Sequence, residues 1–145
     1  MREYSLWQNI RRNLTKPLWQ RIETGGTGRG IPDVFGAFEG ECCWIELKIA
    51  KGNRVDLRPE QIAWLIKFGQ TGLKTFILVG TDKRKMYLFP GLEAIIVKDH
   101  GLKADSLLEL SAPYDWSKLQ ETLFWTCTKC IRKILTCSYK LLSGH

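Results

Sequence analysis

Three charged residues have the types and spacing needed for metal-assisted chemistry. Asp33, Glu46 and Lys48 lie in the stretch GIPDVFGAFEGECCWIELK, whose other residues are typical of two strands. If Glu39 and Gly40 form a two-residue turn, the resulting register places Asp33 directly opposite Glu46. Lys48 returns to the same face of its strand two residues later. The stretch therefore predicts a hairpin with an Asp, Glu and Lys cluster on one face.

This cluster is unfavourable unless a further charge compensates it. Two carboxylates about 5 Å apart repel by about 3 kcal/mol at an effective dielectric near 20, and Lys48 relieves only part of this. Mg²⁺ accepts hard oxygen ligands and needs only one or two carboxylates beside water and a substrate phosphate. Spacing alone also leaves open the alternative of a solvated face with a fortuitous salt bridge.

The surrounding sequence predicts a sheet and helices that position this cluster. Ile45, Leu47 and Ile49 alternate with the charged residues and are expected to face a core. An amphipathic helix is expected first, with Leu6, Trp7, Ile10 and Leu14 facing inward. The strand LWQRIET, the hairpin and a helix from Pro59 to near Gly69 follow. The strands KTFILVG and KMYLF and a helix over Ser117 to His145 complete the order. This order predicts a mixed α/β fold in one domain.

The cluster resembles the active-site signature of the PD-(D/E)XK nuclease superfamily. Pro32-Asp33 precedes Glu46-Leu47-Lys48, and Gly30 precedes the Pro-Asp pair. Among its members the chain is similar to VRR-NUC type nucleases and Holliday junction resolvases, from about Glu3 to Phe89. The resemblance implies a restriction-endonuclease-like core over residues 1–112, with a mixed central β-sheet flanked by helices. A C-terminal helical extension, 113–145, is expected to pack on that core or on a second subunit.

The resemblance also implies a role for each residue of the motif. Asp33 and Glu46 would be metal ligands, with the backbone carbonyl of Leu47 as a third. Lys48 would orient the attacking water and stabilise charge on the phosphate. Gln61, on the helix after the motif, would position water or substrate by hydrogen bonding.

Related nucleases often add an acidic residue from the first helix. Glu3 has the right place in the order, Glu23 on the preceding strand is the competitor, and we favour Glu3. Trp44 is expected on the active face, where it could stack on a base of the substrate.

The chain is basic, with a formal net charge of +7, which favours a polyanionic partner. The candidate phosphate contacts are Arg11, Arg12, Lys16, Arg21 and Arg29. A solvated basic surface is the alternative for each of them singly. The glycine-rich GGTGRG loop lacks the lysine and hydroxyl residue of a phosphate-binding loop, so we interpret it as a connector.

The cysteines and the apolar segments indicate the compartment. The five cysteines are odd in number and do not suggest a disulfide framework. Cys127, Cys130, Cys137 and His145 could be drawn as a zinc site, but their place in an apolar stripe favours packing. Neither a membrane span nor a secretory signal is expected, so we predict an intracellular, soluble protein of a microbe or of a phage-infected host.

These observations together predict a metal-dependent DNA endonuclease that cuts branched DNA. Mg²⁺ is the expected cofactor, with Mn²⁺ as a substitute, and a homodimer is expected because a branched substrate presents symmetric strands. No small-molecule substrate is expected. The alternatives are a nucleic-acid-binding module that does not cut, and a restriction-like or helicase-associated nuclease with another substrate.

Overall fold

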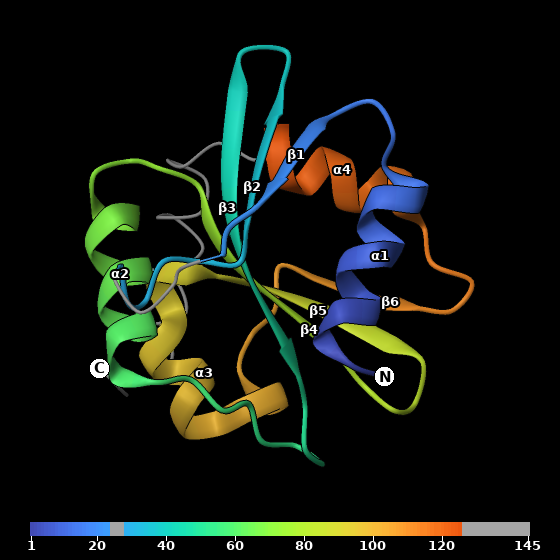
Figure 1. Cartoon of the computed structure of the whole chain (residues 1–145). Coiled ribbons are helices and arrows are strands. Elements are labelled where there is room, and N and C mark those ends of the chain that lie inside the picture. Colours follow the sequence, from blue (N-terminus) through green and yellow to red (C-terminus); the bar gives the residue numbers. More distant parts are fainter. Residues whose placement is uncertain (24–27, 126–145) are drawn as a thin grey trace, which may run out of the picture.

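The fold is built on one mixed six-stranded sheet with helices on both faces (Figure 1). The structure is a computed structural model and describes residues 1–23 and 28–125. The strands are β1 (Leu18–Arg21), β2 (Val34–Phe38), β3 (Glu41–Ile49), β4 (Thr75–Gly80), β5 (Lys85–Pro90) and β6 (Leu108–Ser111). The helices are α1 (Glu3–Asn13), α2 (Pro59–Gln70), α3 (Ala94–His100) and α4 (Trp116–Trp125), with short 3-10 turns η1 (Gly91–Glu93) and η2 (Gly101–Lys103).

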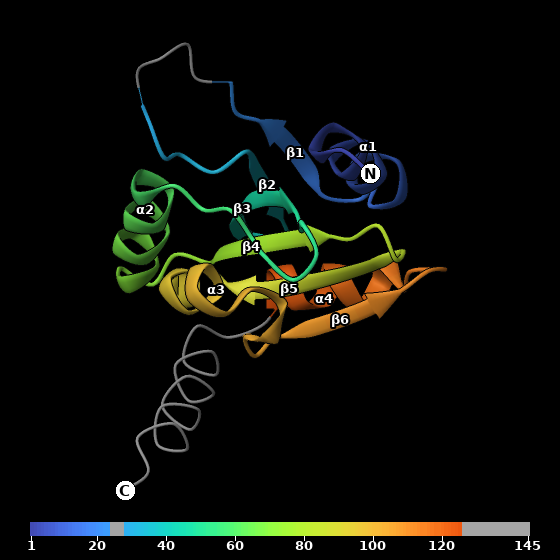
Figure 2. The same ribbon diagram turned by 90° about the horizontal axis from the view of Figure 1, so that it is seen from below.

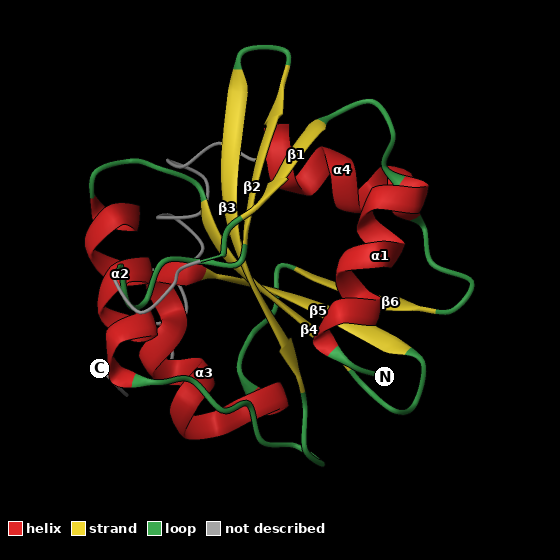
Figure 3. Cartoon of the chain, viewed as in Figure 1, coloured by secondary structure: helices red, strands yellow, loops and turns green. Residues whose placement is uncertain are grey.

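The strands lie in the sheet in their sequence order, β1 to β6. All neighbours are antiparallel except β3 and β4, which pair in parallel. A parallel pair cannot be joined by a tight turn and needs a crossover, which α2 provides (Figure 3). The crossover carries the chain from the end of β3 back to the start of β4, so α2 lies against the sheet beside β3.

Two apolar cores lie on the two faces of the sheet. α2 and α3, which cover one of these faces, lie side by side (Figure 2). One core joins α1 and α4 to one face and includes Leu6, Ile10, Ile45, Leu47 and Phe124. The other joins α2 and α3 to the opposite face and includes Leu65, Ile77, Val79, Phe89 and Val97. Because side chains alternate along β3, residues 44, 46 and 48 face the α2 side.

The predicted hairpin has the register expected from its sequence. Val34 pairs with Ile45 and Phe38 with Glu41, so the two-residue turn is Glu39-Gly40. Both turn residues have positive φ, 49° and 77°, as a type I′ turn requires. The register aligns the two strands of the hairpin so that Asp33 comes opposite Glu46. The predicted α/β fold class is confirmed.

The C-terminal part differs in detail from the sequence expectation. β6, of 4 residues, and α3, of 7 residues, were not predicted. The expected helix at Ser117 begins one residue earlier, and its Leu119 and Leu123 pack in the core beside α1. Residues 126–145, with the cysteines considered for zinc, lie outside the described residues. None of the described helices is long and apolar enough to cross a membrane.

Candidate active site

Asp33 is held at the start of β2 by two hydrogen bonds. Its backbone carbonyl accepts a bond from the Ile22 N–H at 2.8 Å, which continues the β1–β2 pairing. Its side-chain Oδ2 accepts a bond from the Leu47 N–H of β3, also at 2.8 Å. The side chain is therefore directed toward β3, and its second oxygen, Oδ1, takes no part in this bond.

Glu46 is a buried carboxylate in the middle of β3. Its side chain is only 2% exposed, and its Oε1 accepts a hydrogen bond from Gln61 Nε2 at 2.8 Å. The ammonium of Lys48 lies 3.8 Å from the same oxygen. The other oxygen, Oε2, is buried without a hydrogen-bond partner. A buried unpaired carboxylate oxygen is unfavourable, and a metal ion is the kind of partner that would remove the penalty.

The electrostatics of this region are those of crowded carboxylates. Burial raises the pKa of Glu46 to about 9, and the neighbouring Asp33 adds to the increase, while Lys48 opposes it. In the absence of a cation the folded protein thus favours the protonated form of Glu46 at neutral pH. A divalent cation would reverse this preference, because it stabilises the ionised carboxylate.

Gln61 connects Glu46 to the first turn of α2. Its Nε2 donates to Glu46, and its Oε1 accepts from the Arg58 N–H at 3.0 Å, which forms part of a capping box. The side chain is buried, and both ends of the amide contact protein. The two hydrogen bonds let Gln61 orient Glu46, and its positioning of water or substrate stays a prediction.

Gly30 brings the loop before Asp33 against the same turn of α2. Its φ is +87°, and a Cβ at this position would overlap the carbonyl oxygen of Glu60. The loop and the helix can therefore approach this closely only when residue 30 is glycine.

Gly30→Ala is expected to lower the free energy of unfolding by about 2 to 5 kcal/mol, from left-handed strain and overpacking together. Gly40→Ala is the matched control, because Gly40 has a φ of +77° but open space around its missing Cβ. The measurement is urea unfolding of both variants and the parent. Equal losses at the two glycines would show that the contact with Glu60 has no special importance.

Glu3, rather than Glu23, lies near the two carboxylates. The pKa of Glu3 lies above its ordinary value, chiefly because the side chain is partly buried. The Lys48 and Arg21 charges oppose this increase, and the Asp33 charge adds to it. Glu3 also contributes to the raised pKa of Glu46. Glu23 is exposed at the edge of the glycine-rich loop. Glu3 reaches this position because it begins α1, which packs across β3.

The donor set fits a hard divalent cation. Because the N–H and C=O of a strand residue point to the same side, the Leu47 carbonyl faces the side of β3 on which Asp33 accepts its N–H. Within residues 1–23 and 28–125, no three His, Cys, Asp or Glu side chains are grouped to hold a metal on their own. Two carboxylates and a carbonyl, completed by water and a phosphate, still match the coordination that Mg²⁺ uses.

The predicted phosphate contacts lie at different distances from this cluster. Arg11 and Arg12 are exposed near the end of α1, about 12 Å along the helix axis from Glu3, and Lys16 is exposed beyond it. Arg29 is exposed in the loop before Asp33. The Arg11 guanidinium lies over the Trp7 ring at 5.7 Å, and the structure does not gather these four side chains at the carboxylates.

Arg21 and Arg58 are the arginines whose charge acts on the Glu3 carboxylate. Both lower the pKa of Glu3. The Arg21 guanidinium lies over the Tyr4 ring at 5.7 Å, and its Nη1 is buried without a partner. Sequence reasoning included Arg21 but missed Arg58, whose position follows from the N-cap of α2.

Trp44 faces the α2 side of the sheet, as expected, and belongs to a row of aromatic rings. Its ring centroid lies 4.9 Å from that of Phe35 and 5.3 Å from that of Trp64. Trp64 in turn stacks on Phe68 at 4.1 Å. The helical spacing of Trp64 and Phe68 could have indicated their common direction, but not their contact with Trp44.

The fold and the site together define a nuclease core of the PD-(D/E)XK type. Residues 8–111 match the family model described as archaeal Holliday junction resolvase (hjc). This match spans well over half of the chain, and the chain belongs to that family. The protein is therefore a DNA-cleaving nuclease of the resolvase class.

Solved structures give a weaker likeness. A Holliday junction resolvase, Hjc from Archaeoglobus fulgidus, matches with 16% sequence identity and a TM-score of 0.47. The alignment covers 61% of this chain and 74% of that chain. No curated protein matches the sequence.

Proposed function

We propose that the protein hydrolyses phosphodiester bonds in four-way DNA junctions with the help of Mg²⁺, for which Mn²⁺ can substitute. The observation that carries this proposal is the buried Glu46, which has Asp33 and Lys48 beside it and one oxygen without a hydrogen-bond partner. Membership of the resolvase family supports the junction as substrate. A module that only binds DNA would have no chemical reason to bury this carboxylate next to another.

Asp33, Glu46 and the Leu47 carbonyl are the proposed ligands of the cation. When bound there, a divalent cation would lower the pKa of a coordinated water and neutralise charge on the scissile phosphate. The oxygens proposed to bind the cation are Oδ1 of Asp33 and Oε2 of Glu46. The other oxygen of Asp33 accepts a hydrogen bond from Leu47, and the other oxygen of Glu46 accepts one from Gln61. The hydrogen bonds thus orient both carboxylates without using the oxygens that ligation needs.

Lys48 is the proposed electrostatic partner of the phosphate. Its side chain is 13% exposed and lies on the same face of β3 as Glu46. An ammonium fixed at this position stabilises the charge that develops on the phosphate oxygens as water attacks. Glu3 is the proposed additional carboxylate, and Gln61 keeps Glu46 in its orientation.

We infer that the active form is a homodimer. A four-way junction presents two symmetry-related strands, and two copies of one site related by a two-fold axis can cut both. Arg11, Arg12, Lys16, Arg21 and Arg29 are the proposed contacts to the phosphates of the arms.

Cleavage of a labelled four-way junction is expected to require Mg²⁺ or Mn²⁺, while the linear duplex arms stay intact. Ca²⁺ should inhibit, because its larger and looser shell occupies the carboxylates without aligning the water. The measurement follows both symmetric strands of the junction on a denaturing gel, at limiting enzyme. Paired cuts within one binding event support the homodimer, whereas full activity in a chelator would refute the metal-dependent reaction.

A further inference from the structure

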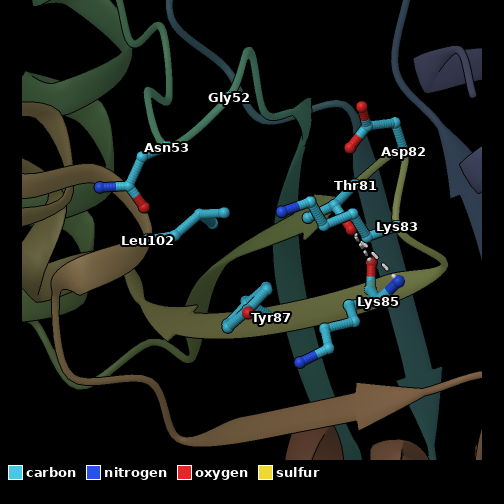
Figure 4. Close-up of a pocket in the computed structure, with 8 residues that line it drawn as sticks. All are labelled: Gly52, Asn53, Thr81, Asp82, Lys83, Lys85, Tyr87 and Leu102. Atoms are coloured by element: carbon cyan, nitrogen blue, oxygen red, sulfur yellow. Dashed lines mark hydrogen bonds between the residues drawn. The ribbon is translucent and has the colours of Figure 1, made fainter.

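A pocket of about 470 Å³ lies away from the carboxylates, at the end of the sheet where β4 turns into β5 (Figure 4). The residues that matter for its chemistry are Asn53, Thr81, Lys83, Lys85, Tyr87 and Leu102. They combine two ammonium groups, a phenol, an amide and a hydroxyl with one aliphatic wall. Asp82 also contributes to the lining, from the β4–β5 turn.

The pocket opens on the same face of the sheet as the catalytic residues. Lys48 pairs with Val79 of β4, and Val79 pairs with Tyr87 of β5. Directly paired residues project from the same face, so Lys48 and Tyr87 lie two strands apart on the side of the sheet that α2 and α3 cover, and Val79 between them is buried. At about 4.8 Å per strand, this separation is about 10 Å.

The walls of the pocket are fixed by backbone contacts. The Leu102 N–H donates to the Asn53 carbonyl at 2.9 Å, and Gly101 packs so closely on that carbonyl that a Cβ would overlap it. On the other side, the Lys85 N–H donates to Thr81 Oγ1 at 3.2 Å and so closes the turn that carries Lys83. The pocket is therefore already formed in the free protein.

The two lysines differ in their partners. Lys85 Nζ lies 3.2 Å from Glu109 Oε1, which also accepts a hydrogen bond from the Tyr87 hydroxyl at 3.2 Å. Among the described residues, no carboxylate lies within ion-pair distance of Lys83. Lys83 thus has no ion-pair partner among the described residues, although Asp82 lines the same pocket, whereas Glu109 partly neutralises Lys85.

We propose that this pocket holds a backbone phosphate, with its nucleotide, of a DNA arm that leaves the metal site. The proposal rests on the proposed function, because it takes the scissile phosphate to lie at Asp33 and Glu46. The two sites are about 10 Å apart across the strands, and Lys83 follows Ile77, the β4 partner of Glu46, by six residues, so an arm and not a single nucleotide has to span them. Lys83 and Lys85 would bind the phosphate oxygens, and the Tyr87 ring and Leu102 would contact the sugar.

The size and the position of the pocket favour a DNA arm over a free anion. A cavity of about 470 Å³ is larger than one phosphate needs, and part of its wall is apolar. Its position at the end of the sheet, away from the carboxylates, suits a contact to an arm of the junction and not to the scissile phosphate.

Lys83→Ala is expected to weaken junction binding about tenfold near 0.1 M salt and to reduce the slope of log affinity against log salt by about 1, as for one lost phosphate contact. Lys118→Ala is the matched control, since Lys118 is exposed on α4, which packs on the opposite face. The measurement is a binding titration at several salt concentrations. Equal losses in the two variants would overturn the proposal.

Glu109→Gln provides a test in the opposite direction. It removes the charge that engages Lys85 and Tyr87, so junction affinity is expected to rise about threefold or more. A gain cannot result from damage to the fold. Adding Lys85→Ala to Glu109→Gln should abolish the gain, and an affinity that does not rise in Glu109→Gln would contradict the proposal.

The cleavage assay separates this proposal from the proposed function. At junction concentrations below saturation, Lys83→Ala should cut more slowly in proportion to its loss of affinity, because the pocket contributes to binding and not to the chemical step. A parent protein that does not cut junctions at all would refute the proposed function, whatever the binding titrations show. A parent that cuts, with Lys83→Ala binding as tightly as the parent, would refute the pocket alone.

Discussion

Asp33→Asn is expected to reduce the rate of junction cleavage by about 10³-fold or more while junction affinity stays the same or rises. The loss follows because the metal ion supplies several kcal/mol of transition-state stabilisation, and each 1.36 kcal/mol corresponds to a factor of about ten. Affinity should not fall, because the change removes a negative charge from a surface that faces phosphates.

The fold should survive this substitution. The side chain of asparagine can keep its oxygen as the acceptor for the Leu47 N–H, which Asp33 accepts at 2.8 Å. The change also removes one source of repulsion on Glu46, so the free energy of unfolding should be unchanged or higher. Thermal unfolding of the purified variant checks this point before any activity is compared.

Lys48→Ala is the contrasting variant for the same assay. It should also stop cleavage, but with some loss of affinity, because it removes a positive charge next to the scissile phosphate. Gel-shift and cleavage measurements on a four-way junction and its linear arms distinguish the two variants. If Asp33→Asn cuts near the parent rate, the opposed carboxylates are not the catalytic centre.

Glu46→Gln is expected to abolish cleavage and, in the absence of divalent metal, to raise the free energy of unfolding by about 1 to 3 kcal/mol. Glutamine can still accept the bond from Gln61 Nε2 through its oxygen. Its amide nitrogen would occupy the position of Oε2, which is buried without a partner and close to the Asp33 carboxylate. An unfavourable interaction in the parent thus becomes a favourable one.

The stability gain should depend on pH in a defined direction. The folded pKa of Glu46, about 9, lies above the ordinary value of 4.5. Between these values the unfolded chain ionises while the folded chain stays protonated, so the free energy of unfolding of the parent falls as pH rises. Glutamine does not titrate, and the advantage of Glu46→Gln should therefore be small near pH 5 and increase toward pH 9.

Mg²⁺ should reverse the comparison. It binds the folded parent and raises its melting temperature, whereas Glu46→Gln lacks a ligand charge and should respond weakly. Melting curves of both proteins across pH 5 to 9, with and without Mg²⁺, test all these expectations. A variant that is less stable than the metal-free parent at pH 8 would show that Glu46 already has a satisfactory partner.

The local part of the site could be predicted from the sequence. The turn at Glu39-Gly40 fixes the register of β2 and β3, and this register alone brings Asp33 to Glu46 and Lys48 to the same face. These relations span few residues and depend on strand geometry, which the alternation of Ile45 and Leu47 with charged residues makes visible.

The remainder depends on packing between distant segments. Glu3 comes near Asp33 and Glu46 because α1 lies across β3, which no local pattern encodes. The two hydrogen bonds of Gln61, to Arg58 and to Glu46, could not be predicted without knowing that α2 starts beside Glu46. The pocket at Lys83 joins a turn, a loop and η2, three segments whose meeting is set by the whole fold.

The unpaired oxygen of Glu46 also has an evolutionary consequence. Most natural proteins lie only slightly above the stability they need, so selection removes a destabilising residue when it has no use. A buried carboxylate with one unpaired oxygen is such a residue, and the proposed metal ligation gives a reason to retain it. Among descendants of this protein that no longer cut DNA, residue 46 should change early, and glutamine or an apolar residue at this position would mark a lineage that has lost the reaction.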